Sequence, residues 1–100
     1  MKITEISVEE LDMYANTLKA LAHPVRIAIL SYLENSKRKS VTEIYEHLQL
    51  EQSVVSHHLK ILKDNDIVVP FRDGKNTFYS LKHNNVSKIL ECINSCKKSE

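Results

Sequence analysis

The stretch 41–60, VTEIYEHLQLEQSVVSHHLK, decides the fold. Its apolar side chains recur at helical spacing in two segments, 41–48 and about 52–63, which are separated by a tight break at 49–51. The first segment presents Ile44, Tyr45 and Leu48 on one face, and the second presents Val55, Leu59 and Leu62. Ser40 stands before the first segment as a candidate N-cap. Two helices joined by about three residues predict a helix-turn-helix.

The residues that follow change from a helical to a strand-like pattern. Residues 68–72 and 76–81 are β-prone runs on either side of Asp73-Gly74, a strong hairpin signal. Pro70 fits such a strand only where the strand has a free edge. A β-hairpin directly after the second helix is a wing, which we expect at about 67–81.

Further helices are predicted on both sides of this unit. Ser7 and Glu10 form a candidate capping box for a helix at about 8–21. His23-Pro24 interrupts this helix, and Pro24 suits the first turn of a second, mostly buried helix that ends near residue 33. Residues 35–40 form a polar, basic connection, and an amphipathic stripe predicts a last helix at about 84–97. The predicted fold is a single winged helix-turn-helix domain over 1–100, mainly α with a β-hairpin wing, in the order α-α-α-α-β-β-α.

The composition excludes several other classes of protein. The 100 residues are 42% apolar and 27% charged, which is typical of a globular domain, and no apolar run suits a membrane helix. A single glycine excludes a glycine-rich phosphate loop, and no nucleophile–base pair or cofactor motif indicates an enzyme. Two cysteines and no apparent signal peptide predict a cytoplasmic protein. The net charge of +1 does not by itself indicate a nucleic-acid partner.

The predicted helix at 52–63 offers polar side chains opposite its apolar face. These side chains cluster in the first turns and are Gln52, Ser53, Ser56, His57 and Lys60. Small residues let the start of a helix approach base edges in the major groove, where Gln, Ser and His read donors and acceptors. Candidate contacts to backbone phosphates are Lys60, Lys63 and, from the wing at 71–77, Arg72 and Lys75. This pattern predicts double-stranded DNA as a partner.

Other polar residues near this helix fit structural roles better. His58 is expected to be partly packed, whereas its neighbour His57 faces DNA. His23, next to Pro24, is expected to be a structural residue at the start of a helix. The basic run 37–39 is more typical of a solvated loop than of a DNA contact.

The sequence resembles the arsenic-repressor (ArsR/SmtB) family of winged-helix regulators. The resemblance is carried by LKALAHPVRIAIL at 18–30, by QSVVSHHLKILK at 52–63, and by the stretch from Val68 through Asp73-Gly74-Lys75 to Leu81. It covers about residues 11–95, and the combination of LAHPVR with SHHLK is specific. The resemblance implies a homodimeric repressor whose terminal helices form the dimer interface and whose helix after the tight turn reads DNA.

The apolar stripes of the two terminal helices independently predict a homodimer. The candidate interface residues are Leu11, Tyr14 and Leu18 in the first helix and Val86, Ile89, Leu90 and Ile93 in the last. A small core cannot cover both stripes, and monomers rarely leave an apolar patch of that size exposed. A twofold dimer would also place two reading helices about one DNA turn apart, which matches a palindromic operator.

The resemblance also implies metal sites, for which this sequence lacks the usual ligands. Ser40-Val41-Thr42-Glu43 stands where some members carry a Cys-x-Cys-type pair, and Asn85 and Ser99 replace ligands at the two ends of the last helix. We therefore predict no cofactor. The weak candidates for a soft metal are His83, Cys92 and Cys96, and the two cysteines fit better as small apolar residues of the dimer stripe.

Two functions stay open at this point. The first is a sequence-specific repressor, and the alternative is a winged-helix protein–protein interaction module without DNA binding. Asp64, Asp66 and Asp73 near the reading surface favour the alternative. For a repressor, the effector would be a small organic inducer, a redox signal through Cys92 or Cys96, or absent, with constitutive binding.

Overall fold

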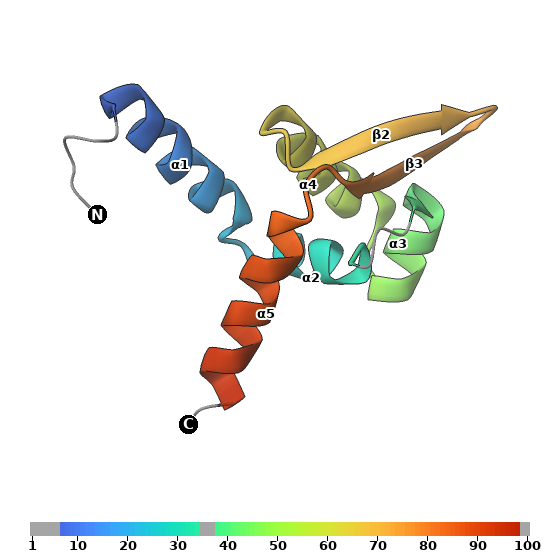
Figure 1. Cartoon of the computed structure of the whole chain (residues 1–100). Helices are drawn as coiled ribbons and strands as arrows, with labels where there is room; N and C mark the ends of the chain where they lie inside the picture. The colour runs from blue at the N-terminus through green and yellow to red at the C-terminus, as the bar shows by residue number, and fades with distance from the viewer. Residues whose placement is uncertain (1–6, 35–37, 99–100) are drawn as a thin grey trace.

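The computed structural model describes residues 7–34 and 38–98 and confirms the predicted winged helix-turn-helix (Figure 1). The elements are, in chain order, α1 (Val8–Leu21), α2 (Pro24–Tyr32), β1 (Lys39–Ser40), α3 (Val41–Leu48), α4 (Gln52–Asp64), β2 (Val68–Asp73), β3 (Asn76–Leu81) and α5 (Asn85–Lys98). The short strand β1 was not predicted, because we expected residues 35–40 to be a connection without regular structure. Every predicted helix and both strands of the wing are present.

The core is built around α2, as its apolar sequence predicts. Ile29, Leu30 and Leu33 are completely buried there, and they pack with the inward faces of α3 and α4 and the base of the wing. The other members of this core are Ile44, Val55, Leu59, Leu62, Ile67 and Val68, with Ala20, Leu21, Val86 and Leu90 from the terminal helices. Truncating a buried leucine such as Leu30 to alanine typically costs about 2–5 kcal/mol.

Local signals in the sequence define where the helices begin and end. The Ser7–Glu10 capping box forms as predicted, and a second capping box at Ser40 and Glu43 starts α3. The Nδ1 atom of His23 accepts a hydrogen bond from the backbone amide of Val25 at 3.1 Å, which confirms a structural role at the start of α2. Left-handed residues follow both helices of the helix-turn-helix, namely Gln49 (φ 56°) after α3 and Asp66 (φ 60°) after α4.

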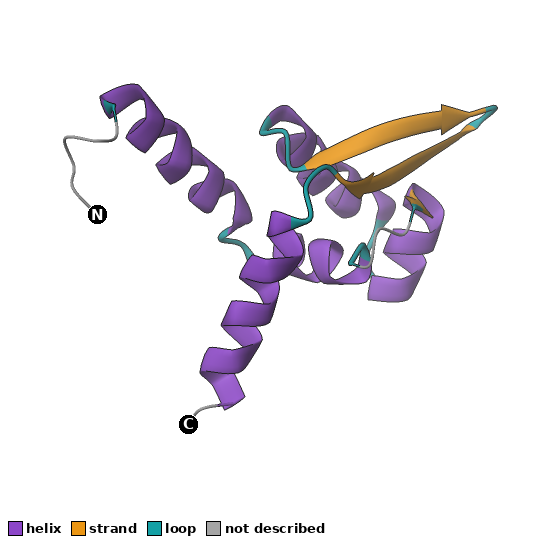
Figure 2. Cartoon of the chain, in the orientation of Figure 1, coloured by secondary structure: helices purple, strands orange, loops and turns teal. Residues whose placement is uncertain are grey.

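The three strands form an antiparallel sheet in the order β1-β3-β2 (Figure 2). Asp73 pairs with Asn76, so the hairpin loop consists of Gly74 and Lys75 and not of Asp73-Gly74. Gly74 has a φ of +64° at the first position of this loop, where a type II′ turn requires such a conformation. Pro70 lies opposite Tyr79 in β2, an edge strand within the described sheet, as expected.

Helices α1 and α5 project from the body that carries the wing (Figure 1). The Cα radius of gyration is 14.9 Å, larger than the roughly 13 Å of a compact chain of this length. The extended shape therefore reflects two terminal helices that the rest of the chain covers only in part. None of the described helices has both the length and the apolar character needed to cross a membrane.

Candidate nucleic-acid interface

The outer face of α4 presents the side chains that the sequence assigned to DNA reading. Gln52, Ser53, Ser56, His57 and Lys60 are all exposed. The opposite face is buried through Val55, His58, Leu59 and Leu62, which fix the rotation of the helix about its axis. The N-cap residue Glu51 makes no side-chain cap hydrogen bond, so its carboxylate does not occupy the first amides of α4. These amides remain oriented for an external acceptor.

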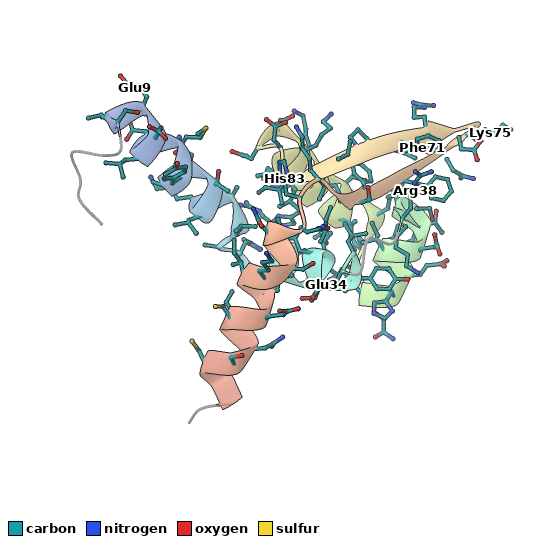
Figure 3. All side chains as sticks on the ribbon, in the orientation of Figure 1. Glu9, Glu34, Arg38, Phe71, Lys75 and His83 are labelled. Carbon is teal, nitrogen blue, oxygen red and sulfur yellow. The ribbon has the colours of Figure 1, made fainter. Side chains whose placement is uncertain are left out.

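A polar groove of about 310 Å³ joins this helix to the wing. Gln52 and Ser56 line one side of it, and Lys75 lines the other from the tip of the wing (Figure 3). The remaining lining residues come from the start of α3 and from β3, and they are Ser40, Val41, Thr42, Asn76, Thr77 and Tyr79. The structure thus brings Lys75 of the wing together with two predicted residues of α4 that lie about 20 positions earlier in the sequence.

The groove contains residues that sequence reasoning missed. Thr42 lies in the first turn of α3, and Asn76 and Thr77 follow the wing loop directly. The predicted positions of α3 and the hairpin were a usable signal, since both segments border the reading helix in a winged helix-turn-helix. Burial raises the pKa of Tyr79 above its ordinary value of 10, and its neutral hydroxyl can donate a hydrogen bond.

Of the four predicted phosphate contacts, only Lys75 lines this groove. Lys63 and Arg72 are exposed but do not line the groove. The Lys60 ammonium lies 3.0 Å from the Asp64 carboxylate, an exposed ion pair one turn along α4. Of the basic run 37–39, Lys37 lies outside the described residues, and Arg38 packs on the wing residue Phe71 (Figure 3).

An internal polar junction holds the buried side of α4. The Nε atom of Arg26 donates a hydrogen bond to Nδ1 of His58 at 3.2 Å, and its Nη1 atom donates to the backbone oxygen of Ala20 at 3.2 Å. His58 is 8% exposed, which confirms that it is packed, whereas its neighbour His57 is exposed. Burial lowers the pKa of His58, and the nearby His23, Arg26 and His57 lower it further.

The terminal helices leave apolar side chains exposed. Leu18 of α1 is 59% exposed, and Ile93 of α5 is 49% exposed. Val86 and Leu90, which the sequence also assigned to a dimer interface, are already buried against the chain's own core, at 8% and 5% exposure. A hollow of about 330 Å³ between α1, α2 and α5 is lined by Leu18, Leu21, Ala22, Ile27, Leu30, Val86, Ile89, Leu90 and Ile93. Tyr14 is exposed and Leu11 is half-buried.

Comparison with known proteins places this architecture in a family. Residues 23–69 match the family described as bacterial regulatory protein, arsR family. The transcriptional repressor PagR of Bacillus anthracis is 37% identical over 98 residues, covering 93% of this chain and 90% of PagR. This chain belongs to the ArsR family. The transcriptional regulator NmtR of Mycobacterium tuberculosis is 42% identical over 77 residues, and this ArsR-family chain spans 63% of its length, about three-fifths.

Solved structures of ArsR-type regulators agree with the fold. The transcriptional repressor BigR from Xylella fastidiosa aligns with a TM-score of 0.82 and 26% identity, covering 96% of both chains. A homodimeric winged helix-turn-helix DNA-binding domain from Mycobacterium bovis aligns with a TM-score of 0.78 and 25% identity, covering 88% of this chain and 81% of that one. The topology of this ArsR-family chain is therefore shared with proteins of the same class.

The weak metal candidates of this ArsR-family chain do not form a metal site in the structure. Cys92 and Cys96 are exposed on α5, and His83 is exposed before it. Within the described ranges, no three His, Cys, Asp or Glu side chains are grouped so that they could hold an ion. Ser99, the last of the replaced ligand positions, lies outside those ranges. The described residues therefore give no support to the weak metal candidates of the sequence.

Proposed function

We propose that this chain is a sequence-specific DNA-binding transcriptional regulator, a homodimeric repressor and not an enzyme. The observation that carries the proposal is the groove in which Gln52 and Ser56 of α4 meet Lys75 of the wing. A winged helix makes two kinds of contact with a duplex. One helix face contacts the base edges, and a flanking cation contacts a phosphate.

The chemistry of each side chain supports a division of roles. Gln52 and Ser56 carry hydrogen-bonding groups on the exposed face of α4 near its start, which suits base reading in the major groove. Lys75 lies at the tip of the wing, where its ammonium can reach the DNA backbone beside that groove (Figure 3). PagR and BigR are named as transcriptional repressors, which supports repression as the outcome of binding.

The exposed apolar faces of α1 and α5 support assembly as a homodimer. Met13, Leu18 and Ile93 are about half exposed or more, and the hollow between the two helices is almost entirely apolar. A second copy of the same faces would cover this surface by twofold symmetry, which also places the two α4 helices for a palindromic site. The aligned Mycobacterium bovis domain is itself described as homodimeric.

A selection from a random duplex library tests the DNA-binding function without knowledge of the operator. The purified chain is expected to enrich one palindromic sequence, and its Kd for that sequence should rise steeply with salt because phosphates are neutralised on binding. A duplex from upstream of the chain's own gene provides a second probe. Enrichment of no sequence, together with equal binding to scrambled duplexes, would refute the proposal and favour the protein–protein interaction module.

Sedimentation velocity tests the dimer separately. Leu18→Glu and Ile93→Glu place a charge on the proposed interface, and each should convert a dimer to monomers. Val69→Glu is a matched control, because Val69 is also an exposed apolar residue (40%) but lies on the wing. A wild-type chain that sediments as a monomer at micromolar concentration would refute the homodimer.

A further inference from the structure

Arg26 connects three helices through one guanidinium group. Its Nη1 atom donates to the backbone oxygen of Ala20 in the last turn of α1, where helix carbonyls lack partners within the helix. Its Nε atom donates to His58 on the buried face of α4. A single side chain of α2 thus connects the end of a helix in the proposed dimer interface to the helix that carries the reading residues.

The hydrogen bond between Arg26 and His58 defines the protonation state of the imidazole. An arginine side chain donates hydrogen bonds and never accepts them, so Nδ1 of His58 must be the acceptor and can carry no proton. His58 is therefore neutral here, with its proton on Nε2. A proton added to Nδ1 would remove the acceptor and place an imidazolium beside a guanidinium that cannot lose its own charge.

Among the described residues, the groups that act on His58 do not compensate such a charge. The His23 ring, from the α1–α2 connection, lies 4.4 Å from the His58 ring, and the His57 ring of α4 lies 5.1 Å away. His23, Arg26 and His57 all disfavour the charged form, as does burial, and among the described residues no carboxylate of α1, α3 or β2 acts on His58. Protonation of His58 is therefore unfavourable in the packed arrangement.

We propose that the Arg26–His58 pair is a proton-sensitive anchor for α4, and that protonation of Nδ1 releases α4 from Arg26 and weakens DNA binding. His58 is buried, whereas the neighbouring His57 is exposed. His58 therefore acts as a positioning residue for α4 and does not itself contact DNA. This inference rests on the proposed DNA-binding function. It adds to that function a regulatory input, a fall in pH, that needs neither a metal nor an organic inducer.

The direction of the effect follows from the lowered pKa of His58. The neutral, anchored form prevails above the ordinary histidine pKa of about 6.5, and the anchor is lost as the pH falls below that value through the lowered one. The chain contains five histidines, so the pH profile of the wild-type chain must be compared with that of a variant to isolate the effect of His58.

The variant His58→Asn isolates the titration. An asparagine amide oxygen can accept from Arg26 at the position of Nδ1 but does not titrate. We expect its Kd for the selected duplex to lie within a few-fold of wild type near pH 8, since the acceptor is retained. As the pH falls from about 7.5 through the lowered pKa of His58, the ratio of wild-type to variant Kd should rise about tenfold, because only the wild-type chain loses its acceptor on protonation. His83→Asn, which removes an exposed histidine from the connection between β3 and α5, should keep the wild-type profile.

An NMR titration of the wild-type chain without DNA provides a second measurement. His58 should be observed as the Nε2-protonated tautomer, and the amides of α4 should shift with the same midpoint as the His58 ring. Superimposable Kd profiles of wild type and His58→Asn, or α4 amides that do not respond as His58 titrates, would overturn the anchor. Should the selection enrich no DNA sequence, the proposed function would fail, while the NMR arm would still decide whether protonation of His58 releases α4.

Discussion

The guanidinium carbon of Arg38 lies 4.1 Å from the centroid of the Phe71 ring. The first residue stands directly before β1, and the second lies in β2, the far strand of the sheet. This contact spans the sheet, because β3 runs between the two strands. The cation–π contact of Arg38, which we call the brace, thus connects the start of the helix-turn-helix to the wing.

Removing this brace should have a small, measurable effect on stability. Arg38→Ala and Phe71→Leu, combined in a double-mutant cycle by urea denaturation, should give a coupling energy of about 0.5–1 kcal/mol, typical of an exposed cation–π contact. Arg72→Ala paired with Phe71→Leu is the control, because the neighbouring residue in a strand points to the other face of the sheet. A coupling energy no larger than in this control would show that the contact does not stabilise the wing.

Substitutions of Ser56 and Lys75 should have different effects on DNA binding, because Ser56 is proposed to read bases and Lys75 to bind a phosphate. Ser56→Ala should relax sequence preference, since it removes a hydrogen-bonding group from the reading face of α4. Lys75→Ala should weaken binding to all sequences alike and lower the salt slope by about one. Fluorescence anisotropy with the selected duplex and single-base variants, over a range of salt, measures both. Equal losses on all duplexes for Ser56→Ala would contradict its reading role.

The ion pair between Lys60 and Asp64 should restrain DNA binding while contributing little to the stability of the fold. Their side chains are 71% and 53% exposed, so the pair is worth about 0–1 kcal/mol in stability. Asp64→Asn frees Lys60 for phosphate and should tighten DNA binding about two- to fivefold at low salt, with a smaller gain at high salt. Asp66→Asn makes the same change in net charge and frees Lys82 instead, so it should tighten binding less. An equal gain in both variants would mean that net charge alone acts.

The capping box of α3 should make stability depend on acidic pH. The backbone amide of Ser40 donates to Oε1 of Glu43 at 2.9 Å, and this hydrogen bond holds the pKa of Glu43 below its ordinary value of 4.5. Its stabilising effect is present above that value and is lost as the pH falls through the lowered pKa. Urea denaturation at about pH 7 and pH 3 should therefore show a smaller loss of stability for Glu43→Gln than for wild type.

The matched controls for this cap lie on the same helix. Glu46→Gln, outside the capping box, should keep the wild-type loss between the two pH values. Ser40→Ala should cost about 1 kcal/mol at neutral pH, because the amide of Glu43 then lacks the Ser40 hydroxyl as its acceptor. Indistinguishable pH dependence in Glu43→Gln and wild type would refute the linkage.

The sequence predicted most of the fold because its local signals agree with one another. Helical periodicity, two capping residues and the glycine of a hairpin each specify an element without reference to distant parts of the chain. Strand β1 was not predicted, because Lys39 and Ser40 pair with β3 through their backbone and carry no strand-like side-chain pattern. Gln49 likewise takes a left-handed conformation at a residue type without a strong preference for it.

The candidate site was predicted in part, for a related reason. Gln52 and Ser56 were identified from the face of one helix, which periodicity fixes. The Arg26–His58 hydrogen bond joins residues 32 positions apart, and only the packing of α2 against α4 brings them together. The burial of Val86 and Leu90 in the chain's own core could not be predicted either. An apolar stripe in the sequence does not reveal whether the chain's own core or a partner covers it.

Pro70 has a consequence for how this protein behaves at high concentration. It sits within β2, which has β3 on one side and no further described strand on the other. An open strand edge offers a row of amide donors to which another polypeptide can add, a common start of aggregation. Proline has no amide hydrogen, so it interrupts that row within the wing. A repressor that must keep its wing uncovered for DNA thus carries, in the wing itself, a protection against misassembly.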